Sequence, residues 1–314
     1  MSFSSEVKDE LSRQISTARH CLIAEIAAII SMCGRISIST DDKYSIRIHT
    51  ENIAVARKYF TLLKKTFNIN TEISIRQNTH LKKSRTYTLA VLDHEAGVKI
   101  LRAAKLFNEY NEIQESMSTV DNVVIQRTCC KRAFIRGVFL AAGSISNPDK
   151  FYHLEIVCTG KSKARQIQEI LQCFDIDAKI ILRKKYYVLY IKEGSQIVDM
   201  LNVMEAHVAL MNLENVRILK EMRNSVNRQV NCETANINKT VSAAVKQIAD
   251  IKLIQVTGRF DLLPDNLQEI AQVRLEYPEA SLKELGLLLN PQVGKSGVNH
   301  RLRKLSELAD ELRD

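Results

Sequence analysis

Hydrophobic positions recur in the same order twice between residues 18 and 205. Each half shows an apolar helix rich in small residues, an alternating strand, a second helix, a two-stranded hairpin and a closing helix. We expect these elements at 22–37, 44–49, 51–67, 69–76 with 85–92, and 95–107, then at 131–143, 152–158, 162–174, 178–183 with 186–192, and 195–204. The shared order predicts a duplicated α+β unit, with repeats at about 18–107 and 127–205.

Small residues line one face of the first helix in each half. They are Ala24, Ala28 and Ser31 in the first half and Ala133, Gly137 and Ala141 in the second. Because bare faces let helices approach closely, these two helices are predicted to pack as a central pair. Each stretch reaches a glycine, Gly34 or Gly143, where we expect a left-handed C-cap.

The segments on either side of the repeats are also expected to be largely helical. An amphipathic helix over 2–17, capped by Ser4 or Ser5, precedes them. After them, 212–222 and 241–255 show helical periodicity, and the Asn-rich stretch 223–240 is by default a polar joint. The predicted organisation is therefore a two-repeat domain at 1–211, a helical Asn-rich linker at 212–255 and a C-terminal domain at 256–314.

The last sixty or so residues predict three short helices. The first ends before Pro278, and the second opens with the capping box formed by Ser281 and Glu284. The third, capped by Ser296, turns Val298, Leu302, Leu305, Ala309 and Leu312 inward. Basic residues cluster at its start and acidic residues follow Ser306, which is typical of the recognition helix of a helix-turn-helix. A three-helix bundle that packs on a partner protein is the alternative.

The net charge of +9 favours a polyanionic partner. The candidate DNA-contacting residues lie at the start of the third C-terminal helix: Lys295, Ser296, Asn299, His300, Arg301, Arg303 and Lys304. Both hairpin tips are basic as well, and they give a second candidate surface: Arg76, Lys82, Lys83, Arg85, Arg183, Lys184 and Lys185. Such tips could straddle a duplex through phosphate contacts, although hairpin tips are often charged simply because they are solvated.

Three stretches resemble a known family. The helix that ends Arg136-Gly137-Val138-Phe139-Leu140-Ala141-Ala142-Gly143-Ser144 is similar to the LAGLIDADG homing-endonuclease motif and, more narrowly, to the bacterial WhiA family. The segment Asn231-Cys232-Glu233-Thr234-Ala235-Asn236 resembles the WhiA connecting region, and 281–286 with 295–302 resembles the WhiA helix-turn-helix. The resemblance, which extends from Ser4 to Leu312, implies a two-repeat LAGLIDADG-like saddle joined to an all-α helix-turn-helix domain.

The resemblance also implies that nuclease activity has been lost. Homing endonucleases carry a metal-binding acid immediately before the final glycine of each motif, and those positions here are Cys33 and Ala142. Neither side chain can ligate the hard Mg²⁺ ion that phosphodiester hydrolysis needs. Displaced ligands remain an alternative; the candidates are Glu25, Asp41, Asp42 and Asp149. No HExxH, Walker or GxGxxG motif occurs, so we expect no enzyme, cofactor or metal.

Cysteine usage and hydropathy suggest a cytoplasmic protein. The seven cysteines are scattered, with one adjacent pair, Cys129-Cys130, and no CxxC. We interpret them as reduced thiols, with a metal or redox site as the alternative. No stretch reaches the roughly 18 apolar residues of a membrane span, and the N-terminus lacks the pattern of a signal peptide.

Taken with the resemblance, these features imply a sequence-specific transcriptional regulator of sporulation or cell division. The implied partner is double-stranded DNA of promoter regions in the nucleoid, with an RNA polymerase sigma factor or another regulator as a protein partner and no membrane. Two competing hypotheses remain: a residual metal-dependent endonuclease, and a protein-interaction scaffold associated with the nucleoid.

Overall fold

The computed structural model describes residues 2–39, 43–77, 85–107 and 119–313. The chain divides into two compact units, Met1–Lys220 and Glu221–Asp314. Within the described residues, no helix combines the length and apolar character needed to cross a membrane.

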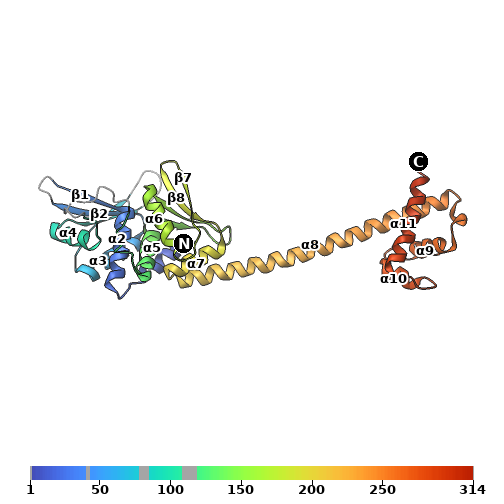
Figure 1. Ribbon diagram of the computed structural model, residues 1–314, viewed down its shortest axis with the longest axis horizontal. Coiled ribbons are helices and arrows are strands. Elements are labelled where there is room, and N and C mark those ends of the chain that lie inside the picture. The colour runs from blue at the N-terminus through green and yellow to red at the C-terminus, as the bar shows by residue number, and fades with distance from the viewer. Residues whose placement is uncertain (1, 40–42, 78–84, 108–118, 314) are drawn as a thin grey trace. The chain divides into compact units, whose positions relative to one another are not determined.

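The first unit contains the predicted duplication (Figure 1). After α1 (Phe3–Arg13), the first repeat comprises α2 (Arg19–Cys33), β1 (Gly34–Ile38), β2 (Tyr44–Thr50), α3 (Ile53–Phe67), β3 (Glu72–Gln77), β4 (Arg85–Val91) and α4 (His94–Ala103). The second comprises α5 (Thr128–Ala142), β5 (Gly143–Ile145), β6 (Leu154–Cys158), α6 (Lys161–Gln172), β7 (Lys179–Arg183), β8 (Tyr186–Ile191) and α7 (Gly194–Met204). Their antiparallel sheets have equivalent strand orders, β1-β2-β4-β3 and β5-β6-β8-β7. The predicted α+β fold class is confirmed.

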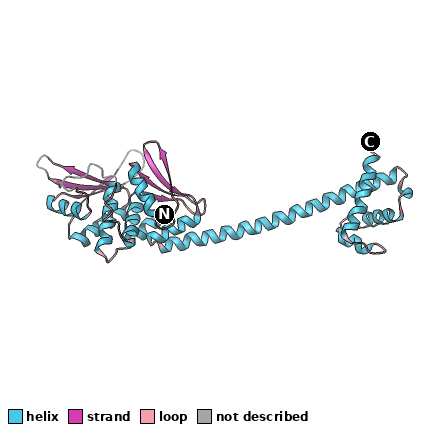
Figure 2. Cartoon of the chain, viewed as in Figure 1, coloured by secondary structure: helices cyan, strands magenta, loops and turns pink. Residues whose placement is uncertain are grey.

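Helices α2 and α5 form the centre of this unit, as their small residues predict. Ala24, Ala28 and Ala133 are fully buried. A Cβ atom on Gly137 would lie 2.8 Å from both the Cβ atom of Ala28 and the carbonyl oxygen of Glu25. The two helix backbones are therefore in contact where the sequence carries its smallest residues, and helices so apolar on all sides are stable only when covered. Figure 2 shows the two sheets along one side of this unit, with helices beneath them.

The predicted left-handed caps at Gly34 and Gly143 are wrong. Gly34 has φ −81° and ψ 150°, and Gly143 has φ −84° and ψ 152°, so both are extended. Each glycine is needed for space instead: a Cβ would lie 2.5 Å from the carbonyl oxygen of Ile30 at Gly34, and 2.3 Å from Cδ2 of Phe139 at Gly143. The chain thus leaves each helix directly into a strand that lies against the last helical turn.

The N-caps of two helices also differ from the prediction. The N-cap of α1 is Ser2, whose Oγ accepts from the amide of Ser5 at 3.2 Å, and the helix ends at Arg13. The third C-terminal helix has Gly294 as its N-cap, which leaves Ser296 inside the first turn. In each case a neighbouring residue with extended backbone geometry takes the cap position.

The Asn-rich stretch does not interrupt the helix. Helix α8 runs from His207 to Val256, although a polar joint was expected at 223–240. Asparagine has only modestly poor helix propensity, so it need not end a helix that continues on both sides. A linker role for 212–255 between domains at 1–211 and 256–314 remains a prediction.

The second unit is a helical domain with its own core. After α8 come a short 3-10 turn (Phe260–Leu262), α9 (Asp265–Glu276), α10 (Leu282–Leu288) and α11 (Lys295–Glu311). Ile251 and Ile254 at the end of α8 share the core with residues of the other three helices, among them Ile270, Leu285 and Leu302. The predicted capping box is confirmed: the amide of Ser281 donates to Glu284 at 2.7 Å and the amide of Glu284 donates to Ser281 Oγ at 3.4 Å.

Replacing Gly137 should separate the two central helices. Gly137→Ala places a methyl group 2.8 Å from Ala28, and we expect a net loss of about 1–3 kcal/mol in the free energy of unfolding, because overpacking outweighs the gain in helix propensity. Urea denaturation measures it. Gly160→Ala is the matched control, since a Cβ there meets nothing within 4 Å. Equal stability of the two variants would contradict the packing argument.

Candidate nucleic-acid interface

The start of α11 presents a polar, mostly basic face. Lys295, Ser296, Asn299, His300 and Arg303 are all exposed, and at about 100° per residue they fall within an arc of about 140°. Lys304 is also exposed, about 40° beyond this arc. Val298, Leu302, Leu305 and Ala309 are buried on the other side of the helix. The structure thus brings six of the seven predicted contact residues onto one surface, called here the α11 face.

Arg301, the seventh predicted residue, lies elsewhere. Its NH1 is 3.7 Å from the Glu269 carboxylate and donates to the backbone oxygen of Asn266 at 3.4 Å, both in α9. Glu269 also accepts from the amide of Asn290 at 2.7 Å. Through Glu269, Arg301 therefore helps to fix α11 and the preceding connection on α9.

Two further contacts set the position of the connection between α10 and α11. The amide of Val293 donates to the carbonyl oxygen of Gly286 at 3.0 Å, and a Cβ on Gly286 would lie 2.0 Å from the Val293 oxygen. Only glycine allows this approach. The buried Arg274 donates to the carbonyl oxygen of Ala280 at 2.7 Å and so holds the turn before α10. The connection at 289–294, although long for a helix-turn-helix, is closely fixed.

The predicted reversal of charge along α11 is present on the surface. Arg303 Nε donates to Glu307 at 3.0 Å, and both side chains are largely exposed, at 78% and 59%. An exposed pair of this kind contributes little stability, so the guanidinium can exchange it for another acceptor. Towards the N-terminal end the face has only neutral and basic side chains, whereas Asp310 and Glu311 follow at the C-terminal end.

The first unit has a second polar surface that sequence reasoning largely missed. A groove of about 850 Å³ lies over the outer face of the first sheet; besides Arg76, it is lined by Arg35, Ser37, Arg47, His49, Ser74, Gln77, Thr86 and Thr88. Arg35 lies directly opposite Arg47 across β1 and β2. The alternation of buried Ile46 and Ile48 with exposed Arg47 and His49 is the signal that could have revealed this face.

The second sheet carries different chemistry at equivalent positions. Register places Ser144 where the first sheet has Arg35, Glu155 where it has Arg47, and Val157 where it has His49. The Glu155 carboxylate lies 3.4 Å from His153 Nε2, which is the polar pairing typical of a structural role. Val157 and Ile181 are exposed on the same face. The two halves of the saddle therefore offer unlike surfaces.

The basic hairpin residues predicted as a second candidate surface belong to both sheets. Arg76 in β3 lines the groove of the first sheet, and Arg85 is exposed at the start of β4. Lys82 and Lys83 lie outside the described residues. Arg183, Lys184 and Lys185 are all exposed at the turn between β7 and β8, where Lys184 has a φ of 56°. Arg76 and Arg183 occupy equivalent register positions, so both sheets carry an arginine there.

Two lysines lie near Cys33, one of the two positions at which the homing-endonuclease motif carries an acid. Cys33 ends α2, and burial raises the pKa of its thiol to about 12. Lys8 and the buried Lys163 both interact electrostatically with Cys33, and burial lowers the pKa of Lys8 to about 8. Lys163 also donates to the backbone oxygen of Ser31. Among the described residues, this end of the helix pair therefore offers amines and a thiol where a hard metal would need carboxylates.

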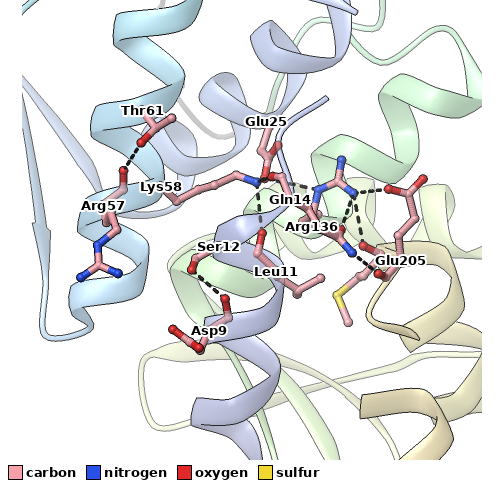
Figure 3. Close-up of polar contacts among 11 residues, drawn as sticks. Asp9, Leu11, Ser12, Gln14, Glu25, Arg57, Lys58, Thr61, Arg136 and Glu205 are labelled. Carbon is pink, nitrogen blue, oxygen red and sulfur yellow. Dashed lines mark hydrogen bonds and ion pairs between the residues drawn. The ribbon is translucent and has the colours of Figure 1, made fainter. Parts of the chain in front are cut away.

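Glu25, one of the alternative metal ligands, is fully buried between cations (Figure 3). Its Oε1 lies 3.0 Å from Lys58 Nζ and 3.4 Å from Arg136 Nε. Burial raises the pKa of the Glu25 carboxyl and lowers that of Lys58, and the ion pair opposes both shifts. Arg136 also binds the Glu205 carboxylate at 2.6 Å, and Lys58 donates to the backbone oxygen of Leu11 at 3.1 Å. Glu25 is thus a structural acid that has no access to solvent or substrate.

Of the other three candidate metal ligands, the structure describes only Asp149, which is not part of any group of metal-ligating side chains among the described residues. Asp149 is exposed in the loop after β5, and Asp41 and Asp42 lie outside the described residues. The geometry defines a class of protein in which two LAGLIDADG-like repeats with altered catalytic positions accompany a helix-turn-helix module.

Comparisons with known proteins identify the family. Sequence profiles match for the WhiA N-terminal LAGLIDADG-like domain at 19–107, the WhiA LAGLIDADG-like domain at 131–223 and the WhiA C-terminal HTH domain at 226–309. The chain is 60% identical over its full length to all of a "Probable cell division protein WhiA" of Lachnoclostridium phytofermentans, and 49% identical to that of Clostridium novyi, of which it covers 99%. The chain belongs to the WhiA family, as the sequence resemblance predicted.

Solved structures agree with this fold. The full-length DUF199/WhiA of T. maritima matches with a TM-score of 0.59 and 26% identity over 99% of both chains. The N-terminal LAGLIDADG domain of DUF199/WhiA matches 64% of this chain and 89% of that domain, with a TM-score of 0.50 and 24% identity.

Neutralising Glu25 should destabilise the first unit strongly. Glu25→Gln leaves the buried Lys58 and Arg136 without their shared carboxylate, and we expect a loss of about 3–5 kcal/mol in the free energy of unfolding. Thermal and urea denaturation measure it. Asp9→Asn is the control, because it breaks an exposed pair with Arg13 and should cost less than about 1 kcal/mol. Near-normal stability of Glu25→Gln would show that the carboxylate is not needed for folding.

Proposed function

We propose that this protein is a sequence-specific DNA-binding transcriptional regulator whose α11 face enters the major groove and whose LAGLIDADG-like unit has no nuclease activity. The observation that carries the proposal is the α11 face itself: six exposed polar and basic side chains on one side of a helix that is fixed on its support. The relatives named as probable cell division proteins support a role in cell division. Sporulation and association with the nucleoid are implied by the family resemblance alone.

The side chains of the α11 face match the chemistry of base recognition. Arginine and lysine bind guanine O6 and N7, asparagine binds adenine N6 and N7, and serine can bond to either base or to phosphate. Lys295 and Ser296 in the first helical turn suit phosphate contacts, while Asn299 and Arg303, each one turn further along, can reach base edges. A face for packing on a protein would instead be expected to carry exposed apolar side chains.

The groove on the first sheet fits an accessory role in the same function. Arg35, Arg47 and Arg76 converge on it together with hydroxyl groups, a combination that binds phosphates without reading sequence. The second sheet, with Glu155, Val157 and Ile181, suits a protein partner such as another regulator better than it suits DNA. DNA bound to the first unit would therefore lie mainly along its first repeat.

Removing Arg303 should weaken specific binding. Arg303→Ala is expected to cost about 1–3 kcal/mol, roughly 5- to 150-fold in Kd, if the guanidinium reads a guanine. The measurement is fluorescence anisotropy of the full chain with duplexes selected in vitro from genomic DNA, compared with shuffled duplexes. Lys252→Ala, which removes an exposed cation from α8 of the same unit, is the control and should leave the specificity ratio unchanged.

The same reactions separate the competing functions. Intact duplex after incubation with Mg²⁺ is the expected result, and cleavage would restore the endonuclease hypothesis. If Arg303→Ala and Lys252→Ala bind alike, and if selected and shuffled duplexes bind alike, the α11 face does not read DNA and the protein-scaffold hypothesis gains support.

Removing two cations from the groove should change the salt dependence of binding. For the double variant Arg35→Ala/Arg47→Ala, the slope of log Kd against log salt should fall by about 2, with selectivity retained, since each phosphate contact contributes about 0.9 to the slope. Anisotropy titrations at several salt concentrations measure it. Arg102→Ala, exposed on α4, serves as the control. An unchanged slope for the double variant would remove the first sheet from the DNA interface.

A further inference from the structure

A cluster of three thiols and an imidazole lies at the N-terminal ends of the two central helices. His20 and Cys21 are in the first turn of α2, and Cys129 and Cys130 are in the first turn of α5. One ligand atom from each of the four lies within 4.8 Å of all the others. His20 Nδ1 is 3.2 Å from the sulfur of Cys130, 3.3 Å from that of Cys21 and 4.0 Å from that of Cys129.

These separations match tetrahedral coordination. With Zn–S bonds of about 2.3 Å and a Zn–N bond of about 2.0–2.1 Å, a tetrahedral ion holds nitrogen and sulfur about 3.5 Å apart and two sulfurs about 3.8 Å apart. Of the three observed nitrogen–sulfur distances, two are shorter and one is longer than the ideal of about 3.5 Å. One ion could therefore bind all four residues if the nitrogen–sulfur distances change by a few tenths of an ångström. The sulfur–sulfur distances, which are at most 4.8 Å, would have to change by no more than about 1 Å.

The four residues occupy equivalent positions in the two repeats. His20 corresponds to Cys129 and Cys21 to Cys130, counted back from Gly34 and Gly143. Each repeat thus contributes two ligands from consecutive positions in the first turn of its central helix.

We propose that His20, Cys21, Cys129 and Cys130 form a Cys₃His site for a structural zinc ion that clamps the two repeats together. A complete set of four soft and borderline ligands selects Zn²⁺ over Mg²⁺ or Ca²⁺ and leaves no position open for substrate. Cys21 and Cys130 are buried and His20 is partly buried, while Cys129 is exposed, so an ion can enter from the Cys129 side.

This site is separate from the ancestral catalytic centre. Cys33 and Ala142 are at the C-terminal ends of the same two helices, and a helix of 15 residues is about 22 Å long. The proposal is also independent of DNA recognition by α11, because both repeats lie in the first unit.

Metal analysis of the full chain tests the proposal. The protein is purified anaerobically from zinc-supplemented cells, assayed for zinc by mass spectrometry, then stripped and titrated with Co²⁺. We expect about one zinc per chain and the intense absorption of tetrahedral Co²⁺–thiolate coordination. Cys129→Ser should lower Zn²⁺ affinity at least tenfold against a chromophoric chelator and abolish the Co²⁺ spectrum. Cys232→Ser, an exposed thiol on α8, should retain both.

Two further measurements, circular dichroism and DNA affinity, test whether the Cys129→Ser variant still folds. Cys129 is exposed, so its serine variant should keep the circular dichroism spectrum and the DNA affinity of the parent. Three results would overturn the proposal: zinc well below stoichiometric in the parent chain, a weak octahedral Co²⁺ spectrum, or equal metal affinity in Cys129→Ser and Cys232→Ser. Recovery of two of the three cysteines as a disulfide from the anaerobically purified protein would overturn it too.

Discussion

A buried carboxylate within the close pair α2 and α5 is the constraint on which the first unit depends. Gly137 and Ala28 bring the two backbones together, and that approach encloses Glu25, which then needs cations as partners. Lys58 from α3 and Arg136 from α5 supply them, and Arg136 continues to Glu205 at the end of α7. Desolvating these charges costs free energy that only the complete network offsets, so the interaction specifies one arrangement of helices from both repeats.

The same arrangement shows where this LAGLIDADG-like unit departs from the homing-endonuclease motif. Cleavage needs acids at the helix ends, where Gly34 and Gly143 turn the chain into the sheets. This protein has Cys33 and Ala142 there, with Lys8 and Lys163 close to the thiol. Its one acid in the helix pair, Glu25, is instead committed to holding the helices together. What the scaffold retains is a rigid support for two sheets.

The sequence predicted features that depend on local patterns. Period-two and period-3.6 alternation revealed the repeated elements, and Ser281 with Glu284 marked the start of α10. Features set by contacts between distant residues were missed or misassigned. Gly34 was placed in a left-handed cap because glycine favours one, whereas the crowding by Ile30 appears only in three dimensions. Arg301 follows the basic pattern of its neighbours, yet Glu269 on another helix draws it away from them. The thiol cluster has no CxxC because its two halves come from different repeats.

The two repeats share the same backbone fold, and they differ in the side chains that point outward from their sheets. A sheet fixes which residues face outward by its register, so an outward position can change without disturbing the core. Arg35 and Arg47 in the first sheet correspond to Ser144 and Glu155 in the second, a difference of two cations on one side and one anion on the other. At these positions a polyanion would be attracted by the first surface only. The opposite holds one pair further along, where the second sheet has Lys179 and the first has Glu72. Under the proposed function, DNA would therefore contact the two sheets unevenly. Base recognition would then fall to α11, and the second sheet would be free for a different partner.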